Sequence, residues 1–239
     1  MTNTFPEPLV AARGLTKVYR SGTVETQALR GIDLALYPGE FTAVVGPSGG
    51  GKTTLLNIIG ALDSPTEGEL HILGHDLRRL SRRARAELRL RELGFVFQAF
   101  NLMPVLTAQE NVEFVLELQG VGQERVGRAR QVLEQLGLAE LAGRRPGELS
   151  GGQQQRVAVA RAVASLPRLV LADEPTANLD GDNAELLLTM MRELNEKKKI
   201  TFLFSTHDPR VVAHARRVLT LVDGRITGDA EGNPQAVRG

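Results

Sequence analysis

The 239-residue sequence contains no cysteine, which excludes a disulfide framework and a thiolate metal site. It also has almost no net charge, because 29 lysines and arginines stand against 28 aspartates and glutamates. A balanced chain has no overall field that favours nucleic acid or an anionic membrane, so recognition of an anion has to be local. The sequence lacks an apolar run that would span a membrane and a start typical of a secretory signal. We therefore expect a cytosolic protein that reaches a membrane only through a partner.

Short apolar, β-rich runs alternate with helical patterns along most of the chain. The runs are residues 41–46, 169–172, 200–204 and 217–226. This alternation predicts an α/β fold with a mixed, mostly parallel core sheet.

Two helices have clear sequence signals. The first begins at Lys52 and is expected to bury one side, formed by Leu55, Leu56, Ile58, Ile59 and Leu62. The second covers residues 182–197, with Asp182 and Glu185 as a capping pair and three lysines near its end.

The chain is predicted to form a single domain over residues 1–239, with lobes. Residues 1–45 together with 66–75 favour an antiparallel β lobe. Residues 99–165 show helical periodicity without a strong strand pattern, and we expect them to form an inserted helical lobe. Residues 46–98 and 166–239 then form the core.

GPSGGGKT, residues 46–53, fits the pattern GxxxxGK[ST] and lies between an apolar run and an amphipathic helix. Its glycines allow successive N–H groups to turn inward around a phosphate, Lys52 supplies a cation, and Thr53 offers a hydroxyl to Mg²⁺. We call residues 46–53 the phosphate loop. The alternative is an ordinary glycine-rich turn that binds no phosphate.

A second alternative is a serine hydrolase, because GPSGG also fits the pattern GxSxG of a nucleophile elbow. Ser48, Asp173 and His207 even follow one another in the order of such a triad. That interpretation leaves Lys52 and Thr53 without a role.

Two further runs end in polar residues at the edge where α/β sheets bind ligands. The run at 169–172 is followed by Asp173 and Glu174. Neighbours on an extended strand point to opposite faces, so we expect Asp173 to approach a metal and Glu174 to polarise an attacking water. His207 follows the run at 200–204 and is placed to reach a γ phosphate; a structural histidine is the alternative.

LSGGQQQR, residues 149–156, adds a second potential anion site. Ser150, Gly151 and Gly152 precede a predicted helix and would present free N–H groups at its positive end.

Over nearly its whole length, the chain resembles the ATP-binding subunit of an ABC transporter. The resemblance is carried by six motifs in this order: GPSGGGKT, FQ at 97–98, LSGGQQQR, LVLADEP, NLD at 178–180 and STH at 205–207. The resemblance implies a P-loop ABC ATPase domain in which two copies face each other head to tail. ATP held by the phosphate loop of one copy would then be closed by residues 149–156, the signature stretch, of the other. The second anion site would thus serve the partner's nucleotide.

The resemblance also implies roles for individual residues. Catalysis would involve Glu174 as the base, His207 as a switch, and Gln98 and Lys52. Mg²⁺ would be held by Thr53, Gln98 and Asp173. ATP would be bound by Tyr19 on the adenine and by Gly46, Pro47, Ser48, Gly49, Gly50, Gly51, Lys52, Thr53, Thr54, Ser150, Gly151, Gly152, Gln153 and Asp180.

The wider sequence is similar to the ATPases of lipoprotein-release, macrolide-export and cell-division systems. This similarity implies a homodimer in the ATP-bound state and an integral membrane permease as partner, on the cytoplasmic face of the inner membrane. Two alternatives remain open: an ATPase of an importer, and a nucleotide-gated scaffold or regulator of a membrane complex.

The arginine-rich residues 77–93 are expected to form a helix with a stripe of Leu77, Leu80, Ala84 and Leu88. Its arginines form a solvated face or contact the permease or lipid head groups. We expect no nucleic-acid partner, because no aromatic residues interleave with the arginines. After Gln98, Phe100, Met103, Val105, Leu106 and Phe114 either pack in the helical lobe or line a groove for a permease helix.

Overall fold

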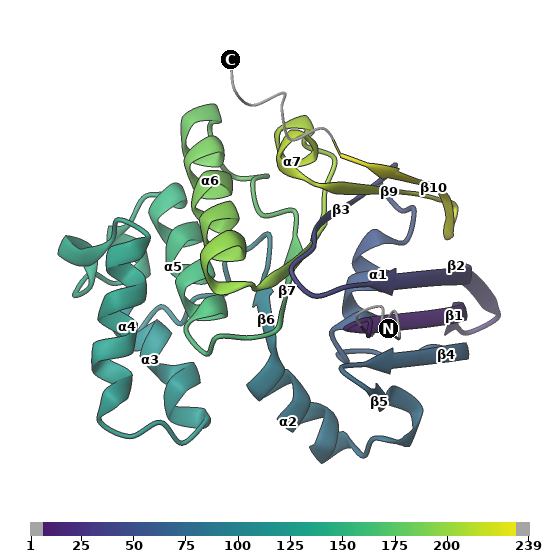
Figure 1. The fold of residues 1–239 in the computed structure, drawn as a ribbon, viewed down its shortest axis with the longest axis horizontal. Helices are drawn as coiled ribbons and strands as arrows, with labels where there is room; N and C mark the ends of the chain where they lie inside the picture. The colour runs from purple at the N-terminus through teal and green to yellow at the C-terminus, as the bar shows by residue number, and fades with distance from the viewer. Residues whose placement is uncertain (1–6, 233–239) are drawn as a thin grey trace, which may run out of the picture.

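The computed structural model describes residues 7–232, in which two sheets and their helices form a layered α/β molecule (Figure 1). The strands are β1 (Val10–Ser21), β2 (Val24–Leu36), β3 (Phe41–Val45), β4 (Glu67–Ile72), β5 (His75–Asp76), β6 (Leu93–Val96), β7 (Leu169–Asp173), β8 (Thr201–Ser205), β9 (Arg217–Val222) and β10 (Arg225–Glu231). The helices are α1 (Lys52–Ile59), α2 (Arg82–Glu92), α3 (Ala108–Leu118), α4 (Glu124–Gln135), α5 (Gly151–Val163), α6 (Gly181–Lys198) and α7 (Pro209–His214). Short 3₁₀ turns lie at Leu77–Arg79, Ala139–Leu141 and Pro146–Glu148.

The core sheet has the order β10-β9-β3-β8-β7-β6. Strands β9, β3, β8, β7 and β6 pair in parallel, and β10 pairs antiparallel with β9. The predicted mixed, mostly parallel sheet is therefore confirmed. Parallel pairing brings the carboxyl ends of β3, β7 and β8 to one edge, where such sheets place their ligands.

Alternate residues of the core strands enter two separate apolar clusters. In β8, Phe202 and Phe204 pack with helices α3 to α6, whereas Leu203 packs on the opposite face with α1 and the second sheet. The same alternation occurs in β7, where Val170 and Leu171 face opposite sides. Both faces of the sheet are covered, which explains why its strands are almost continuously apolar.

The second sheet is antiparallel, with the order β2-β1-β4-β5. It lies on the side of the molecule away from α3 and α4 (Figure 1). Except for Asp76 at the end of β5, these strands lie within the range predicted for the β lobe, residues 1–45 with 66–75; that range also includes β3, which belongs to the core sheet instead. The first six residues of that range and the end of the 1–239 domain lie outside the described residues.

Residues 99–165 contain α3, α4 and α5 and no strand, in agreement with the predicted helical character. Figure 1 shows these helices gathered at one side of the core sheet. Helix α5 also packs on β6: a Cβ at Gly94 would lie 2.4 Å from the carbonyl oxygen of Ala162. The strand β6 itself was not predicted.

Several predicted boundaries were wrong. The apolar run at 217–226 is a hairpin of two strands, because Asp223 and Gly224 take positive φ values of 47° and 73°. Helix α6 is capped by Asp180, whose carboxylate accepts from the N–H of Asn183, and not by Asp182. Glu185, the second predicted capping residue, lies 2.7 Å from Nε2 of His214 instead. Leu62 lies beyond α1 and is 48% exposed.

The predicted helix over 77–93 is interrupted, because Ser81 caps a new helix with its hydroxyl and leaves a 3₁₀ turn before it. Leu77 and Leu88 are buried as expected. Two arginines turn inward: Arg85 donates to the carbonyl of Leu77 and Arg89 to that of Ala61. No helix within residues 7–232 combines the length and apolar character that crossing a bilayer requires.

Candidate functional site

The phosphate loop connects β3 to α1 at the carboxyl edge of the core sheet. Gly51 has a φ of 102°, and a Cβ there would lie 2.6 Å from the carbonyl oxygen of Ala28. Gly46 is packed more tightly still, since its Cβ would lie 1.9 Å from the carbonyl oxygen of Leu221. Larger residues at these positions would displace the loop.

The turn between β9 and β10 supports the loop from behind. The N–H of Gly224 donates to the carbonyl of Gly50 at 3.1 Å, and the N–H of Arg30 donates to the carbonyl of Gly224 at 2.8 Å. The loop therefore rests on main-chain atoms of two other segments.

Lys52 is the first residue of α1 and is only 8% exposed. Its ammonium group donates to the carbonyls of Gly46, at 2.8 Å, and Pro47, at 3.0 Å. No ion pair among residues 7–232 neutralises it. Since α1 also lacks a side-chain cap, its first N–H groups and Lys52 together form a place for a phosphate anion.

A cavity of 620 Å³ opens over this loop and is bounded by the ends of β7 and β8. Its lining residues are Ala28, Gly46, Pro47, Ser48, Gly49, Gly51, Lys52, Thr53, Thr54, Gln98, Glu174, Ser205 and His207. The fold thus gathers most of the predicted site around one space. Gly50 does not line it.

Thr53 and Asp173 meet beside the cavity: the hydroxyl of Thr53 donates to Oδ1 of Asp173 at 3.2 Å. The hydroxyl of Ser205 lines the same cavity, is buried, and has no hydrogen-bond partner among the described residues. Hydroxyl and carboxylate oxygens are the ligands that Mg²⁺ prefers, so these residues fit the expected metal. Ser205 was not predicted, although its position before His207 at a strand end is the signal that would have found it.

Glu174 and His207 form a pair at the edge of the cavity. Oε1 of Glu174 lies 2.8 Å from Nδ1 of His207, and the backbone N–H of His207 donates to Oε2 at 3.4 Å. The side chain of Glu174 is 15% exposed and that of His207 is 74% exposed. The argument from alternating strand neighbours was wrong for Glu174, because β7 ends at Asp173 and Glu174 has a φ of 45°.

Gln98 follows β6 and lines the cavity. Its backbone carbonyl accepts from Nδ2 of Asn178 at 2.8 Å, which connects the end of β6 to the loop after β7. Asn178 was not predicted as a functional residue.

Tyr19 is not among the residues that line the cavity. Its hydroxyl donates to Asp63 at 3.0 Å, and the ammonium group of Lys17 lies 4.8 Å from the ring centre. Its proposed stacking on adenine therefore stays a prediction.

The signature stretch lies outside the cavity of its own chain. Ser150 caps α5: its hydroxyl accepts from the N–H of Gln153 at 3.3 Å, and its own N–H donates to Oε1 of Gln153 at 2.8 Å. The N–H groups of Gly151 and Gly152 lie in the first turn, where a helix offers no carbonyl partner.

Asp180 lies beside this helix start. Asn183, whose N–H groups hydrogen-bond to Asp180, would meet a Cβ at Gly152 at 2.8 Å. These hydrogen bonds, first of all the one from the backbone of Asn183, lower the pKa of Asp180.

The serine hydrolase alternative is not supported by this geometry. His207 pairs with Glu174 and Asp173 with Thr53, so Ser48, Asp173 and His207 do not form a triad. A loop built for phosphates, with a carboxylate and a histidine at the ends of neighbouring strands, defines a nucleoside triphosphatase.

Comparison with known proteins identifies the family. The ABC transporter family profile matches residues 29–177, and the chain belongs to this family as its ATP-binding and ATP-hydrolysing cassette. It is 47% identical over 231 residues to the lipoprotein-releasing system ATP-binding protein LolD of Anaeromyxobacter dehalogenans, covering 96% of this chain and 97% of that one.

Two other relatives show how widely the fold is used. The macrolide export ATP-binding/permease protein MacB of Wolinella succinogenes is 45% identical over 222 residues, which cover 92% of this chain and 34% of MacB. A dimeric structure of the ATP-binding cassette MJ0796, bound to ADP and Pi after hydrolysis, matches with a TM-score of 0.87 and 41% identity, covering 93% of this chain and 98% of that one. The predicted ABC cassette fold is confirmed.

Proposed function

We propose that two copies of this chain close head to tail around two ATP molecules and drive a membrane permease. One observation carries the closure: the phosphate loop lines the cavity, whereas Ser150, Gly151, Gly152 and Gln153 do not. The first N–H groups of α5 that the cap leaves without a carbonyl partner can bind an anion, and that anion has to come from outside the chain's own cavity. A second copy offers that anion in a two-fold arrangement. The dimeric structure of the related MJ0796 cassette supports this assembly.

Within each closed site, Lys52 and the phosphate-loop N–H groups hold the β and γ phosphates. The carboxylate of Glu174 accepts a proton from the attacking water, and His207 orients that carboxylate through its 2.8 Å contact. Gln98 lines the same cavity and would bind the attacking water as well. Thr53, Gln98 and Asp173 would hold Mg²⁺, which neutralises charge on the phosphates when bound.

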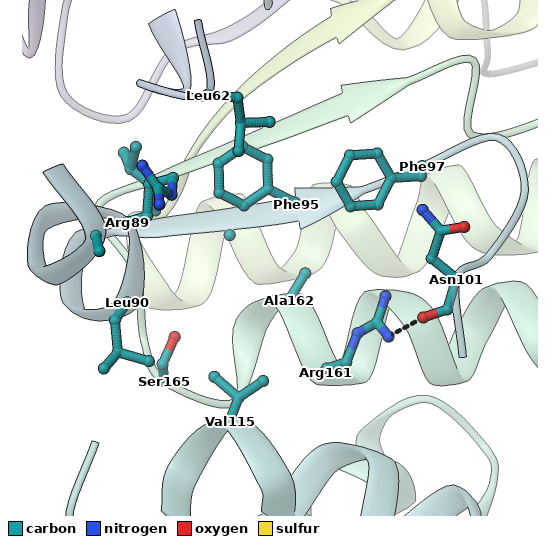
Figure 2. A pocket seen from close by; sticks show the side chains of 13 residues that line it. Leu62, Arg89, Leu90, Phe95, Phe97, Asn101, Val115, Arg161, Ala162 and Ser165 are labelled. Carbon is teal, nitrogen blue, oxygen red and sulfur yellow. Dashed lines mark hydrogen bonds between the residues drawn. The ribbon is translucent and has the colours of Figure 1, made fainter. Parts of the chain in front are cut away.

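The permease partner is proposed from the relatives whose names describe lipoprotein release and macrolide export. The chain would then work at the cytoplasmic face of the inner membrane. A pocket of 390 Å³ beside the end of β6 is a suitable docking place for a permease segment (Figure 2). It is lined by apolar side chains, including Phe95, Phe97 and Val115, and by Arg89 and Arg161. Phe100, Met103, Val105, Leu106 and Phe114, the residues suggested by the sequence, do not line it.

The dimer is tested with a Glu174→Gln variant, which keeps the shape of the site but cannot accept the proton. The protein should then accumulate as a closed dimer with Mg-ATP bound. We expect sedimentation analysis to show a monomer without nucleotide and a dimer at saturating Mg-ATP.

The matched control is Glu174→Gln combined with Ser150→Arg, which leaves the phosphate loop intact and blocks the partner's contact. It should bind a fluorescent ATP analogue and remain monomeric. A Glu174→Gln protein that binds the analogue but stays monomeric would contradict the proposed closure.

A further inference from the structure

The turn formed by residues 98–101, which we call the Gln98 turn, is held through three of its backbone carbonyls. Nδ2 of Asn178 donates to the carbonyl of Gln98 at 2.8 Å. The guanidinium of Arg161 donates to the other two: Nη2 to the carbonyl of Phe100 at 3.0 Å, and Nη1 to that of Asn101. Figure 2 shows Arg161 reaching from α5 to Asn101.

The backbone of this turn is strained. Phe100 and Asn101 have φ values of 56° and 51°, so two successive residues other than glycine occupy the left-handed region. Such a pair persists only where its surroundings hold it. Arg161 binds the backbone carbonyls of these same two residues, Phe100 and Asn101.

Arg161 lines the pocket proposed for the permease, but among residues 7–232 its side chain donates hydrogen bonds only to the Gln98 turn. It is half-buried in the last turn of α5, next to buried apolar residues of that helix, and no ion pair among residues 7–232 includes it. Burial lowers the pKa of its guanidinium, which reflects the cost of removing the charge from water. An arginine kept there without a carboxylate is compensated mainly by the two carbonyls of the turn.

We propose that Arg161 is a positioning residue for Gln98. It fixes the Gln98 turn, and the turn sets where the side chain of Gln98 enters the ATP cavity. This inference rests on the proposed role of Gln98 in hydrolysis. Arg161 belongs to α5, the helix that Ser150 caps, so the Gln98 turn is bonded directly to the helix of the signature stretch.

The test compares Arg161→Met and Arg161→Lys with the unchanged chain in steady-state ATP hydrolysis. The methionine keeps the bulk and removes the donors, so we expect kcat to fall about tenfold while KM and the affinity for a nonhydrolysable ATP analogue stay within about twofold. Lysine can reach one of the two carbonyls, so that variant should recover part of kcat.

The same substitution is then made together with Gln98→Ala. If Arg161 acts through Gln98, Arg161→Met should lower kcat no further in that background. An equal loss in both backgrounds, or weaker analogue binding, would overturn the proposal and leave Arg161 a structural residue. A Gln98→Ala chain with normal kcat would instead refute the proposed role of Gln98, and this inference with it.

Two further variants keep the test decisive. Arg85→Met changes an inward-turned arginine that donates to the carbonyl of Leu77 and lines neither pocket, so its kcat should be unchanged. Asn178→Ala loosens the Gln98 turn from its other side. If Arg161→Met does not fold, Asn178→Ala should still show the fall in kcat and its disappearance beside Gln98→Ala; an additive loss would overturn the positioning of Gln98 by this turn.

Discussion

The loop after β8 places two neighbouring residues in different surroundings. His207 is largely exposed at the mouth of the cavity, whereas Asp208 is 9% exposed and binds both Arg210 and Thr176. Partial burial would raise the pKa of Asp208, but the hydrogen bonds from Arg210 and Thr176 outweigh it and lower the pKa to about 2. Asp208 therefore anchors the loop that presents His207.

This anchor predicts a specific loss of stability in acid. An aspartate in an unfolded chain has a pKa of about 3.9, so the lower folded value stabilises the protein above about pH 4. That stability disappears as the pH falls from about 4 to about 2. After allowance for solvent screening, we expect Asp208→Asn to cost on the order of 1 kcal/mol at pH 6.

Denaturant unfolding of both proteins at several pH values checks this prediction. The difference in unfolding free energy between them should shrink as the pH falls through this range. A difference that stays constant with pH would mean that Asp208 acts by packing alone.

At the scale of elements, the contact between β6 and α5 sets the place of Gln98. Gly94 allows the strand to approach the carbonyl of Ala162, and Gln98 lies two residues beyond the end of the strand. We expect Gly94→Val to cost about 2 to 3 kcal/mol, because the side chain must push α5 away from the sheet. The measurement is the midpoint of denaturant unfolding.

Gly127 in α4 is the matched control. A Cβ there meets nothing within 4 Å, and the position is exposed. Gly127→Ala should stabilise the protein by about 0.5 to 1 kcal/mol through helix propensity. If both substitutions were equally harmful, the tight contact at Gly94 would not be the cause.

Elements with a clear hydrophobic periodicity, or with a motif of fixed residue types and spacing, could be predicted from the sequence. The strands β3, β7 and β8, the helices α1 and α5, and the residues gathered around the phosphate loop belong to this group. Strand β6 could not be predicted, because it has four residues, includes a glycine and follows an arginine-rich helix without a break. Its existence depends on pairing with β7, which local sequence does not encode.

The cap of α6 and the roles of Asn178 and Arg161 were also beyond the sequence. Asp180 and Asp182 are both good capping residues, and only the path of the chain decides between them. The hydrogen bonds of Asn178 and Arg161 join residues 80 and 60 positions apart along the chain. Contacts of that kind depend on how distant segments pack, so no local sequence pattern predicts them.

At the scale of the whole molecule, the two halves of the proposed ATP site are contributed by different copies. This predicts complementation between two inactive variants. Lys52→Ala removes the cation of the phosphate loop, and Ser150→Arg blocks the contact of the signature stretch with the partner's ATP. Each variant alone should hydrolyse ATP very slowly. A mixed dimer contains one site with both defects and one site with neither.

Mixing the two variants in equal amounts should therefore restore about a quarter of the normal rate, if half of the dimers are mixed and their sites act independently. The measurement is ATP hydrolysis before and after mixing. A mixture as inactive as its components would mean that each site is complete within one copy, or that one defective site prevents hydrolysis in the other. In the second case, the two variants should still form mixed dimers with Mg-ATP when both also carry Glu174→Gln.

The turn between β9 and β10 supports the phosphate loop through main-chain atoms: Gly224 bonds Gly50, and the carbonyl of Leu221 lies against Gly46. Apart from the missing N–H of proline, main-chain atoms are the same in every amino acid. Evolution is thus free to change most side chains of this hairpin without altering the nucleotide's cradle, but an inserted or deleted residue would shift the support beneath it. In this hairpin, length is under tighter constraint than composition, with Gly224 as the exception.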